Sequence, residues 1–305
     1  ARVYDVARET PLDEAATLSQ RLDNTVLIKR EDLQPVFSFK LRGAFNKMMS
    51  LSEAERRAGV IAASAGNHAQ GVALAASRLG IPATIVMPRT TPDIKVRAVD
   101  KLKARIVLHG DDYQEAYAHS QEIVAAEGQT FVHPYDDPHV IAGQGTIGME
   151  ILRQCTRDID AIFIPVGGGG LLSGIAAYVK ALRPDIKIIG VEPADAASMT
   201  PSLEKGRRVT LDDAGIFAGG GAVRQSSTWW RDRPARRPSS SRPGKGAKPQ
   251  GGEPASGAGR MSARNASPHT RSPVMVPATG KPRDSSIPRP PYSSRLPPME
   301  TWLQI

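Results

Sequence analysis

Short apolar runs alternate with longer amphipathic stretches from Ala1 to about Arg224. The apolar runs predict strands at Thr25–Lys29, Gly59–Ala63, Ala83–Met87, Arg105–Leu108, Ala161–Val166 and Ile186–Val191. The amphipathic stretches predict helices near residues 40–50, 67–79, 92–103, 112–127, 139–155 and 171–183, and a capping box of Ser52 and Glu55 predicts one more short helix. This alternation indicates an α/β fold with mostly parallel sheets that are covered on both faces.

The alternating pattern ends near residue 225. Residues 225–305 contain 14 Pro, 7 Gly and 13 Ser, but only 9 Val, Ile, Leu, Met or Phe. Such a segment does not bury enough apolar area to offset the entropy of ordering it, so we predict a disordered C-terminal tail. Its Arg/Pro/Ser/Gly composition is also typical of GC-rich DNA translated in a wrong frame. We therefore hypothesise a frameshift near residues 219–226.

The positive charge of the chain belongs to this tail. The whole chain carries a net charge of +9, yet residues 1–224 hold 26 basic and 27 acidic side chains, against 14 and 4 in residues 225–305. The body is therefore not predicted to bind nucleic acid. A single cysteine, Cys155, excludes a disulfide scaffold and favours a reducing, cytoplasmic location. No apolar run approaches the ~20 residues of a membrane span, so no membrane partner is predicted.

Three motifs in the body suggest chemistry, and the first contains a lysine. The run S-F-K-L-R-G-A, from Ser38 to Ala44, places Lys40 at the junction between a loop and a helix. A lysine that attacks a carbonyl group must be partly desolvated, so that its amine can be neutral. A surface lysine on an amphipathic helix is the alternative, and the lysine considered by itself favours that alternative.

The second motif, S-A-G-N-H-A-Q-G, follows a predicted strand and opens a helix at residues 64–71. Its small residues let a ligand approach the backbone, and the free N–H groups at a helix N-terminus suit an anion such as a carboxylate. An ordinary helix start capped by Ser64 or Asn67 is the alternative. For His68, a histidine on the helix face without a ligand fits as well as a functional role.

In the third motif, a predicted strand runs into Gly167, Gly168, Gly169 and Gly170 and then into a helix. Consecutive glycines direct several N–H groups toward one point, as in a phosphate site. No Gly-Lys-Ser/Thr ending follows, and Leu172 stands where G-x-G-x-x-G requires its third glycine. The motif therefore favours a single phosphate over a dinucleotide. A flexible turn packed close to another backbone is the alternative.

Together, the three motifs supply what pyridoxal phosphate requires: a Schiff-base lysine, a phosphate site and a site for an amino-acid carboxylate. Their order, with K-R-E-D at 29–32, I-V-M-P at 85–88 and V-I-A-G-Q-G-T at 140–146, resembles the biosynthetic threonine deaminases (threonine dehydratases). These are fold-type-II pyridoxal-phosphate enzymes related to the tryptophan synthase β subunit. The resemblance covers residues 1 to about 224.

The resemblance implies a role for each motif. Lys40 is the implied catalytic residue, which carries the cofactor and acts as the base at the substrate Cα. The implied cofactor-binding residues are Phe39, Lys40, Asn67, Gly167, Gly168, Gly169, Gly170 and Leu171. The implied substrate-binding residues are Ser64, Ala65, Gly66, Asn67 and His68, mainly through their backbone. No metal site is predicted.

The implied reaction is the dehydration and deamination of L-threonine to 2-oxobutanoate and ammonia, the first step of isoleucine biosynthesis. L-Serine, which lacks only one methyl group, is an expected second substrate that gives pyruvate. The cysteine synthases have a T-S-G-N-T-G-like loop that His68 and its neighbours do not match. Serine racemases use a serine where this chain has Ala65, and a methyl group does not donate a proton, so dehydration is favoured over racemisation.

The resemblance also implies an architecture. We expect a large cofactor-binding domain from residues 1–51 and 146–224, a small domain from 52–145 inserted in it, and the disordered tail at 225–305. The family's serine contact to the pyridine nitrogen is not recognisable, so the large domain is expected to be incomplete. An intact member is expected to be a homo-oligomer. An inactive fragment, or a non-enzymatic body whose basic tail binds nucleic acid or acidic partners, remains the alternative.

Overall fold

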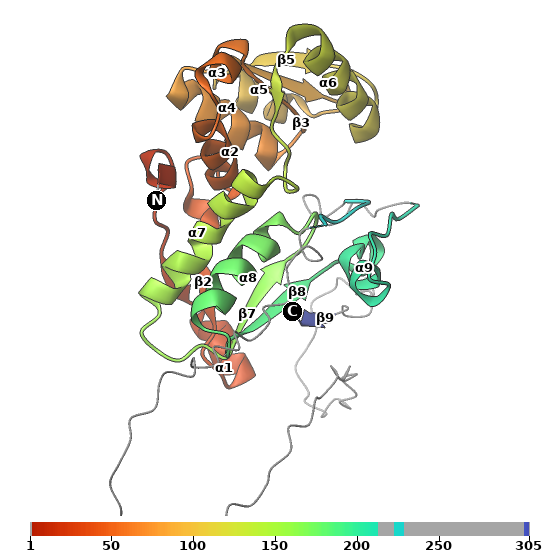
Figure 1. The fold of residues 1–305 in the computed structure, drawn as a ribbon. Helices are drawn as coiled ribbons and strands as arrows, with labels where there is room; N and C mark the ends of the chain where they lie inside the picture. Colours follow the sequence, from red (N-terminus) through yellow and green to blue (C-terminus); the bar gives the residue numbers. More distant parts are fainter. Residues whose placement is uncertain (1, 213–222, 229–301, 305) are drawn as a thin grey trace, which may run out of the picture. The chain divides into compact units, whose positions relative to one another are not determined.

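The computed structural model describes residues 2–212, 223–228 and 302–304 (Figure 1). All of them belong to one compact unit, Ala1–Pro234 with Pro298–Ile305, and a second unit, Ala235–Pro297, lies outside the described residues. The predicted tail and the hypothesised frameshift thus fall largely outside them too. Where the tail is described, Gln225 bridges to Thr210, and 302–304 form a strand.

A four-stranded parallel sheet with the order β5-β4-β3-β6 is the first layer of the fold. Its elements follow one another as β3 (Val60–Ala63), α4 (Asn67–Leu79), β4 (Ala83–Met87), α5 (Asp93–Asp100), β5 (Arg105–Leu108), α6 (Tyr113–Glu127) and β6 (Thr130–Phe131). Val60 and Ala62 of β3 join a core with α4, whereas Ile61 joins a cluster with α6. Both faces of β3 are therefore covered, and the prediction of buried parallel strands is confirmed for the centre of this sheet.

The second sheet has the order β7-β8-β9. β7 (Ala161–Pro165) and β8 (Lys187–Val191) are parallel and are connected by α8 (Gly170–Leu182), while β9 (Trp302–Gln304) runs antiparallel to β8. The prediction of coverage on both faces is wrong at the margins of the two sheets. Phe163 of β7 is 57% exposed and Leu108 of the edge strand β5 is 48% exposed. These strands have one covered face, so their outward-facing apolar side chains meet solvent.

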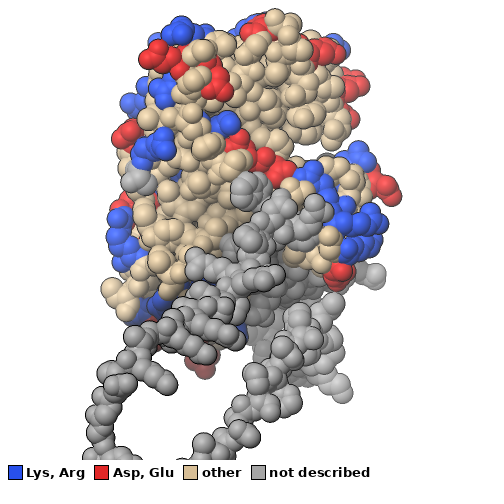
Figure 2. Space-filling model, in the orientation of Figure 1, with Lys and Arg blue, Asp and Glu red and all other residues tan. Residues whose placement is uncertain are grey.

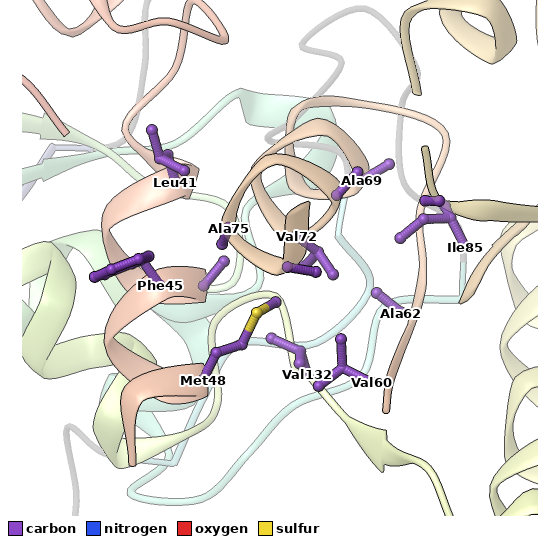
Figure 3. Packing of buried hydrophobic residues seen from close by; sticks show 14 of the residues in the cluster. Leu41, Phe45, Met48, Val60, Ala62, Ala69, Val72, Ala75, Ile85 and Val132 are labelled. Atoms are coloured by element: carbon purple, nitrogen blue, oxygen red, sulfur yellow. The ribbon is translucent and has the colours of Figure 1, made fainter. Parts of the chain in front are cut away.

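Helix α2 (Lys40–Met49) packs against α4 and against α7 (Pro138–Gln154), and α7 packs against α8. Glycines allow this close packing, because a Cβ on Gly143 would lie 2.5 Å from the backbone oxygen of Arg42. Leu41, Phe45 and Met48 of α2 meet Val72 and other residues of the first sheet and α4 in the main core (Figure 3). The start of α2 is thereby held in a fixed position.

The remaining elements are short. They are η1 (Arg2–Asp5), β1 (Leu12–Glu14), α1 (Ala16–Leu22), β2 (Leu27–Lys29), η2 (Glu31–Leu33), α3 (Glu53–Ala58), η3 (Ala194–Ala196) and α9 (Met199–Glu204), with β1 and β2 paired antiparallel. The capping box of Ser52 and Glu55 is present at the start of α3, as predicted. The division into 1–51 with 146–224 and 52–145 stays a prediction.

Two surface properties bear on partners. No helix in the described part of the chain is long and apolar enough to cross a bilayer. Acidic and basic side chains are intermingled over the face drawn in Figure 2. This mixture agrees with the near-neutral charge of residues 1–224.

Candidate active site

Lys40 is the first residue of α2, directly after Phe39 at the N-cap position. Its Nζ donates a hydrogen bond to the Pro134 backbone oxygen at 2.8 Å and lies 5.5 Å from the centre of the Phe39 ring. Burial lowers the pKa of Lys40 from 10.5 to about 8. The prediction of a lysine at a loop-to-helix junction is confirmed, and this environment does not fit the alternative of a solvated surface lysine.

The lowered pKa makes the Lys40 amine reactive near neutral pH. With a pKa of about 8, roughly a tenth of this amine is neutral at pH 7, some two hundred times the fraction of an ordinary lysine. We expect reductive labelling of Lys40 by a small aldehyde to rise about tenfold per pH unit below 8 and to level off above it. Peptide mass spectrometry across pH 6–11 measures this profile against the surface Lys95. A Lys40 profile that keeps rising up to pH 10 would contradict the prediction.

The second motif forms the turn between β3 and α4. The N-cap of α4 is Gly66, with no side-chain capping hydrogen bond, and Asn67 is the first helical residue with an exposed side chain. Ser64 instead accepts a hydrogen bond at its Oγ from the Gly66 N–H at 3.2 Å. The alternative of a helix start capped by Ser64 or Asn67 is therefore wrong. The first N–H groups of α4 remain available to an anion.

The side chain of His68 faces the interior of the protein. Its Nε2 lies 2.8 Å from the Val132 backbone oxygen, so this nitrogen carries the proton. Burial, and then the nearby Lys40 charge, lowers the pKa of His68 to about 3. The ring is therefore neutral at physiological pH. If His68 binds the substrate carboxylate, it would do so through its backbone, as the resemblance implies.

The four glycines form the turn between β7 and α8. Gly169 is the N-cap of α8 with φ +86°, a conformation that favours glycine, and no side chain caps the helix there. A Cβ on Gly168 would overlap the Tyr135 ring, and one on Gly170 would lie 2.6 Å from the Tyr135 backbone oxygen. The close packing that we gave as the alternative is thus present. It leaves the first N–H groups of α8 without a side-chain cap, so a phosphate role stays a prediction.

One segment brings the three motifs together. Between β6 and α7, Val132 contacts His68, Pro134 contacts Lys40, and Tyr135 contacts the glycine turn. Sequence reasoning did not identify this segment. The sequence offered no clear signal for it, because the strand that precedes it, β6, has only two residues.

Two predicted cofactor-binding side chains have an apolar environment. Phe39 and Leu171 are partly buried and pack against the core cluster of the second sheet, which includes Val166 and Leu172. Asn67 differs, because its side chain makes no hydrogen bond to the rest of the described structure. Its implied role in cofactor binding therefore stays a prediction.

The residues present fit pyridoxal phosphate. The Lys40 amine suits an aldehyde because its pKa is low, and the uncapped glycine N-terminus of α8 suits a phosphate. The same segment, around Pro134 and Tyr135, contacts both sites. Fold and site together define the class as an α/β protein of the fold-type-II kind.

Comparisons with known proteins agree with this class. The family described as "Pyridoxal-phosphate dependent enzyme" matches residues 3–234. The chain is 60% identical over 224 residues to the biosynthetic, chloroplastic threonine dehydratase 1 of Solanum lycopersicum, covering 73% of this chain and 37% of that protein. It is 57% identical over 227 residues to a biosynthetic L-threonine dehydratase of Burkholderia multivorans, covering 73% of this chain and 45% of that protein. The chain belongs to the pyridoxal-phosphate dependent enzyme family.

Solved structures give the same result. The processed form of threonine deaminase isoform 2 from Solanum lycopersicum superposes with a TM-score of 0.73 at 56% identity, covering 74% of this chain and 62% of that one. Maize serine racemase superposes with a TM-score of 0.72 at 34% identity, covering 76% and 71%. The resemblance inferred from the motifs is confirmed. The chain spans about two fifths of the length of the curated relatives it matches.

Proposed function

We propose that this chain catalyses the pyridoxal-phosphate-dependent dehydration and deamination of L-threonine to 2-oxobutanoate and ammonia. The observation that carries the proposal is the Lys40 amine, which has a pKa of about 8 and hydrogen-bonds to the segment that also contacts the glycine turn. The similarity to threonine dehydratases over 224 residues supports the choice of substrate. The reaction would be the first step of isoleucine biosynthesis, as the resemblance to the biosynthetic threonine deaminases implies.

The cofactor, when bound, supplies an electron sink for the bond broken at the substrate Cα. The chain's residues would do the rest. The N–H groups of Gly167, Gly168, Gly169, Gly170 and Leu171 would hold the phosphate at the positive end of α8. The backbone from Ser64 to His68 would hold the substrate carboxylate at the start of α4. The neutral Lys40 amine would take the Cα proton, for which a pKa near 8 is suitable.

Two further proposals concern side reactions. L-Serine would be a second substrate that gives pyruvate. Its kcat/KM should be about 10- to 200-fold lower than that of threonine, which is the discrimination that one methyl group provides in an apolar pocket. Racemisation would be absent, because Ala65 has no proton to donate from the loop between β3 and α4.

An assay of the purified chain with added pyridoxal phosphate tests the proposal. We expect 2-oxobutanoate from L-threonine, less pyruvate from L-serine, and no D-serine. Chromatographic separation of the two keto acids and chiral analysis of serine measure all three. Absence of both keto acids from a folded, cofactor-loaded chain would contradict the proposed activity, and D-serine formation would contradict the role given to Ala65.

Assembly, location and domain division complete the proposal. A homo-oligomer, a cytoplasmic location favoured by the lone Cys155, and an inserted small domain at 52–145 remain proposals that follow from the resemblance and the sequence. The intermingled charge of the visible surface gives no support to a nucleic-acid partner for the body (Figure 2).

A further inference from the structure

Two consecutive buried serines have hydroxyl groups without a hydrogen-bonding partner, and the second of them lies next to the glycine turn. Ser226 and Ser227 are each 0% exposed, and neither Oγ has a partner in the described structure. The Ser227 N–H donates to the Gly168 oxygen at 2.8 Å. Its Oγ lies 3.6 Å from the point that a Cβ on Gly169 would occupy. Ser227 therefore directs a free hydroxyl toward the N-terminus of α8.

Unpartnered buried hydroxyls are unfavourable, because the group loses its hydrogen bonds to water and gains none. Two other buried serines avoid this cost, although the buried Ser198 hydroxyl also lacks a partner in the described structure. Ser202 donates to the Ser198 oxygen at 2.6 Å, and Ser120 donates to the Tyr117 oxygen at 2.6 Å. The free Ser227 hydroxyl thus has no structural function within the fold as described. Such an orphaned group indicates a missing partner.

The position of Ser227 is well fixed. Gln225 donates from Nε2 to the Thr210 hydroxyl at 2.6 Å, and the Gln225 backbone oxygen accepts the Tyr135 hydroxyl at 3.1 Å. The Ser227 N–H bond to Gly168 ties the segment to the glycine turn itself. These contacts hold the hydroxyl in place before any ligand binds, so little entropy is lost when one does.

We propose that the Ser227 hydroxyl is an additional ligand of the phosphate group held at the glycine N-terminus of α8. A hydroxyl donates one hydrogen bond, and the helix N-terminus already favours an anion at this point. The proposal rests on the proposed function, which places the cofactor phosphate there. It adds a ligand from outside the three motifs, in the stretch where the predicted tail begins.

Paired titrations with pyridoxal phosphate and with pyridoxal, which lacks the phosphate, test this role. Ser227→Ala in the full chain should raise the Kd for pyridoxal phosphate about 10-fold or more, as expected for a hydrogen bond to a charged group. The Kd for pyridoxal should not change. Absorbance titration measures both constants without turnover. Ser120→Ala, which removes a partnered buried hydroxyl in α6, is the matched control and should change neither constant.

Thermal melting of the cofactor-free variants distinguishes a ligand from a structural residue. Ser227→Ala should melt at the same or a higher temperature, because it removes an unpaired buried hydroxyl, whereas Ser120→Ala should melt lower. A Ser227→Ala variant that misfolds, or that loses affinity for both probes equally, would overturn the proposal. An unchanged Kd for pyridoxal phosphate would overturn it too, and the proposed function would stand. A folded wild-type chain that binds no pyridoxal phosphate would overturn both.

Discussion

Lys40→Ala should lower the rate of 2-oxobutanoate formation from L-threonine by at least 100- to 10,000-fold, the range for the loss of a general base. It should also abolish covalent attachment of the cofactor to the chain. Both effects follow because the Lys40 amine has a pKa of about 8 and is held by the Pro134 oxygen at 2.8 Å. Borohydride trapping followed by peptide mass spectrometry measures attachment, and a keto-acid assay measures turnover.

Two control variants sharpen this result. Lys40→Arg keeps the charge and the length of the side chain, but a guanidinium is not deprotonated in proteins, so it should be as inactive as Lys40→Ala. Lys47→Ala lies on the same helix and removes a salt bridge of 2.8 Å to Asp137. It should retain attachment and most of the activity. Trapping at another lysine, or turnover in Lys40→Arg, would remove Lys40 from the proposed role.

The sequence predicts correctly the helices and strands that have a clear pattern of apolar and polar positions. Each strand and helix predicted between residues 25 and 191 is present, with ends that differ by at most three residues. In these elements local pattern and tertiary packing agree. The elements that were missed have between two and seven residues; they are β1, α1, β6, α9, β9 and the 3-10 helices η1, η2 and η3. At such lengths a periodic pattern is too short to detect, and contacts with the rest of the fold decide the conformation.

Prediction of the site was uneven for a similar reason. The motifs around Lys40 and the four glycines are local, so their sequence shows a helix junction and a glycine turn directly. The contacts that other segments make with the glycine turn are not local. Tyr135 meets Gly168 across 33 residues of chain, and Ser227 meets it across 59. Only the fold brings such residues together, so no spacing rule in one sequence could identify them.

Arg42 illustrates the limit of local reasoning most clearly. In the sequence it stands two residues after Lys40, and nothing in the local pattern marks it as buried. In the structure its side chain is 0% exposed and hydrogen-bonds to Glu31 at 2.8 Å and to Glu150 at 2.5 Å. Lys29 reaches the same Glu150 at 2.6 Å. Two cations and two carboxylates thus form a buried network. It connects α2, which begins at Lys40, with α7 and with the N-terminal segment that contains Lys29 and Glu31.

Glu150→Gln should lower the free energy of unfolding by about 3–5 kcal/mol, because it leaves Arg42 and Lys29 buried with only Glu31 to balance them. The matched control is Glu53→Gln, which breaks an exposed pair with Arg57 and should cost less than about 1 kcal/mol. Urea denaturation of the full chain measures both. Equal losses in the two variants would contradict the role given to the buried network.

The pH dependence of this difference provides an independent check. Burial would raise the pKa of Glu150, but hydrogen bonds from Arg42, Lys29 and Tyr4 outweigh it and hold the pKa below its usual range. A lowered pKa in the folded state gives stability that is fully present above the unfolded value of about 4.3 and is lost as the pH falls through the folded value. The stability gap between wild type and Glu150→Gln should therefore be largest near neutral pH and should narrow in acid. A difference in stability that increased in acid would show that the carboxylate is not the stabilising form of Glu150. Packing rather than charge would then fix the position of α2, which begins at Lys40.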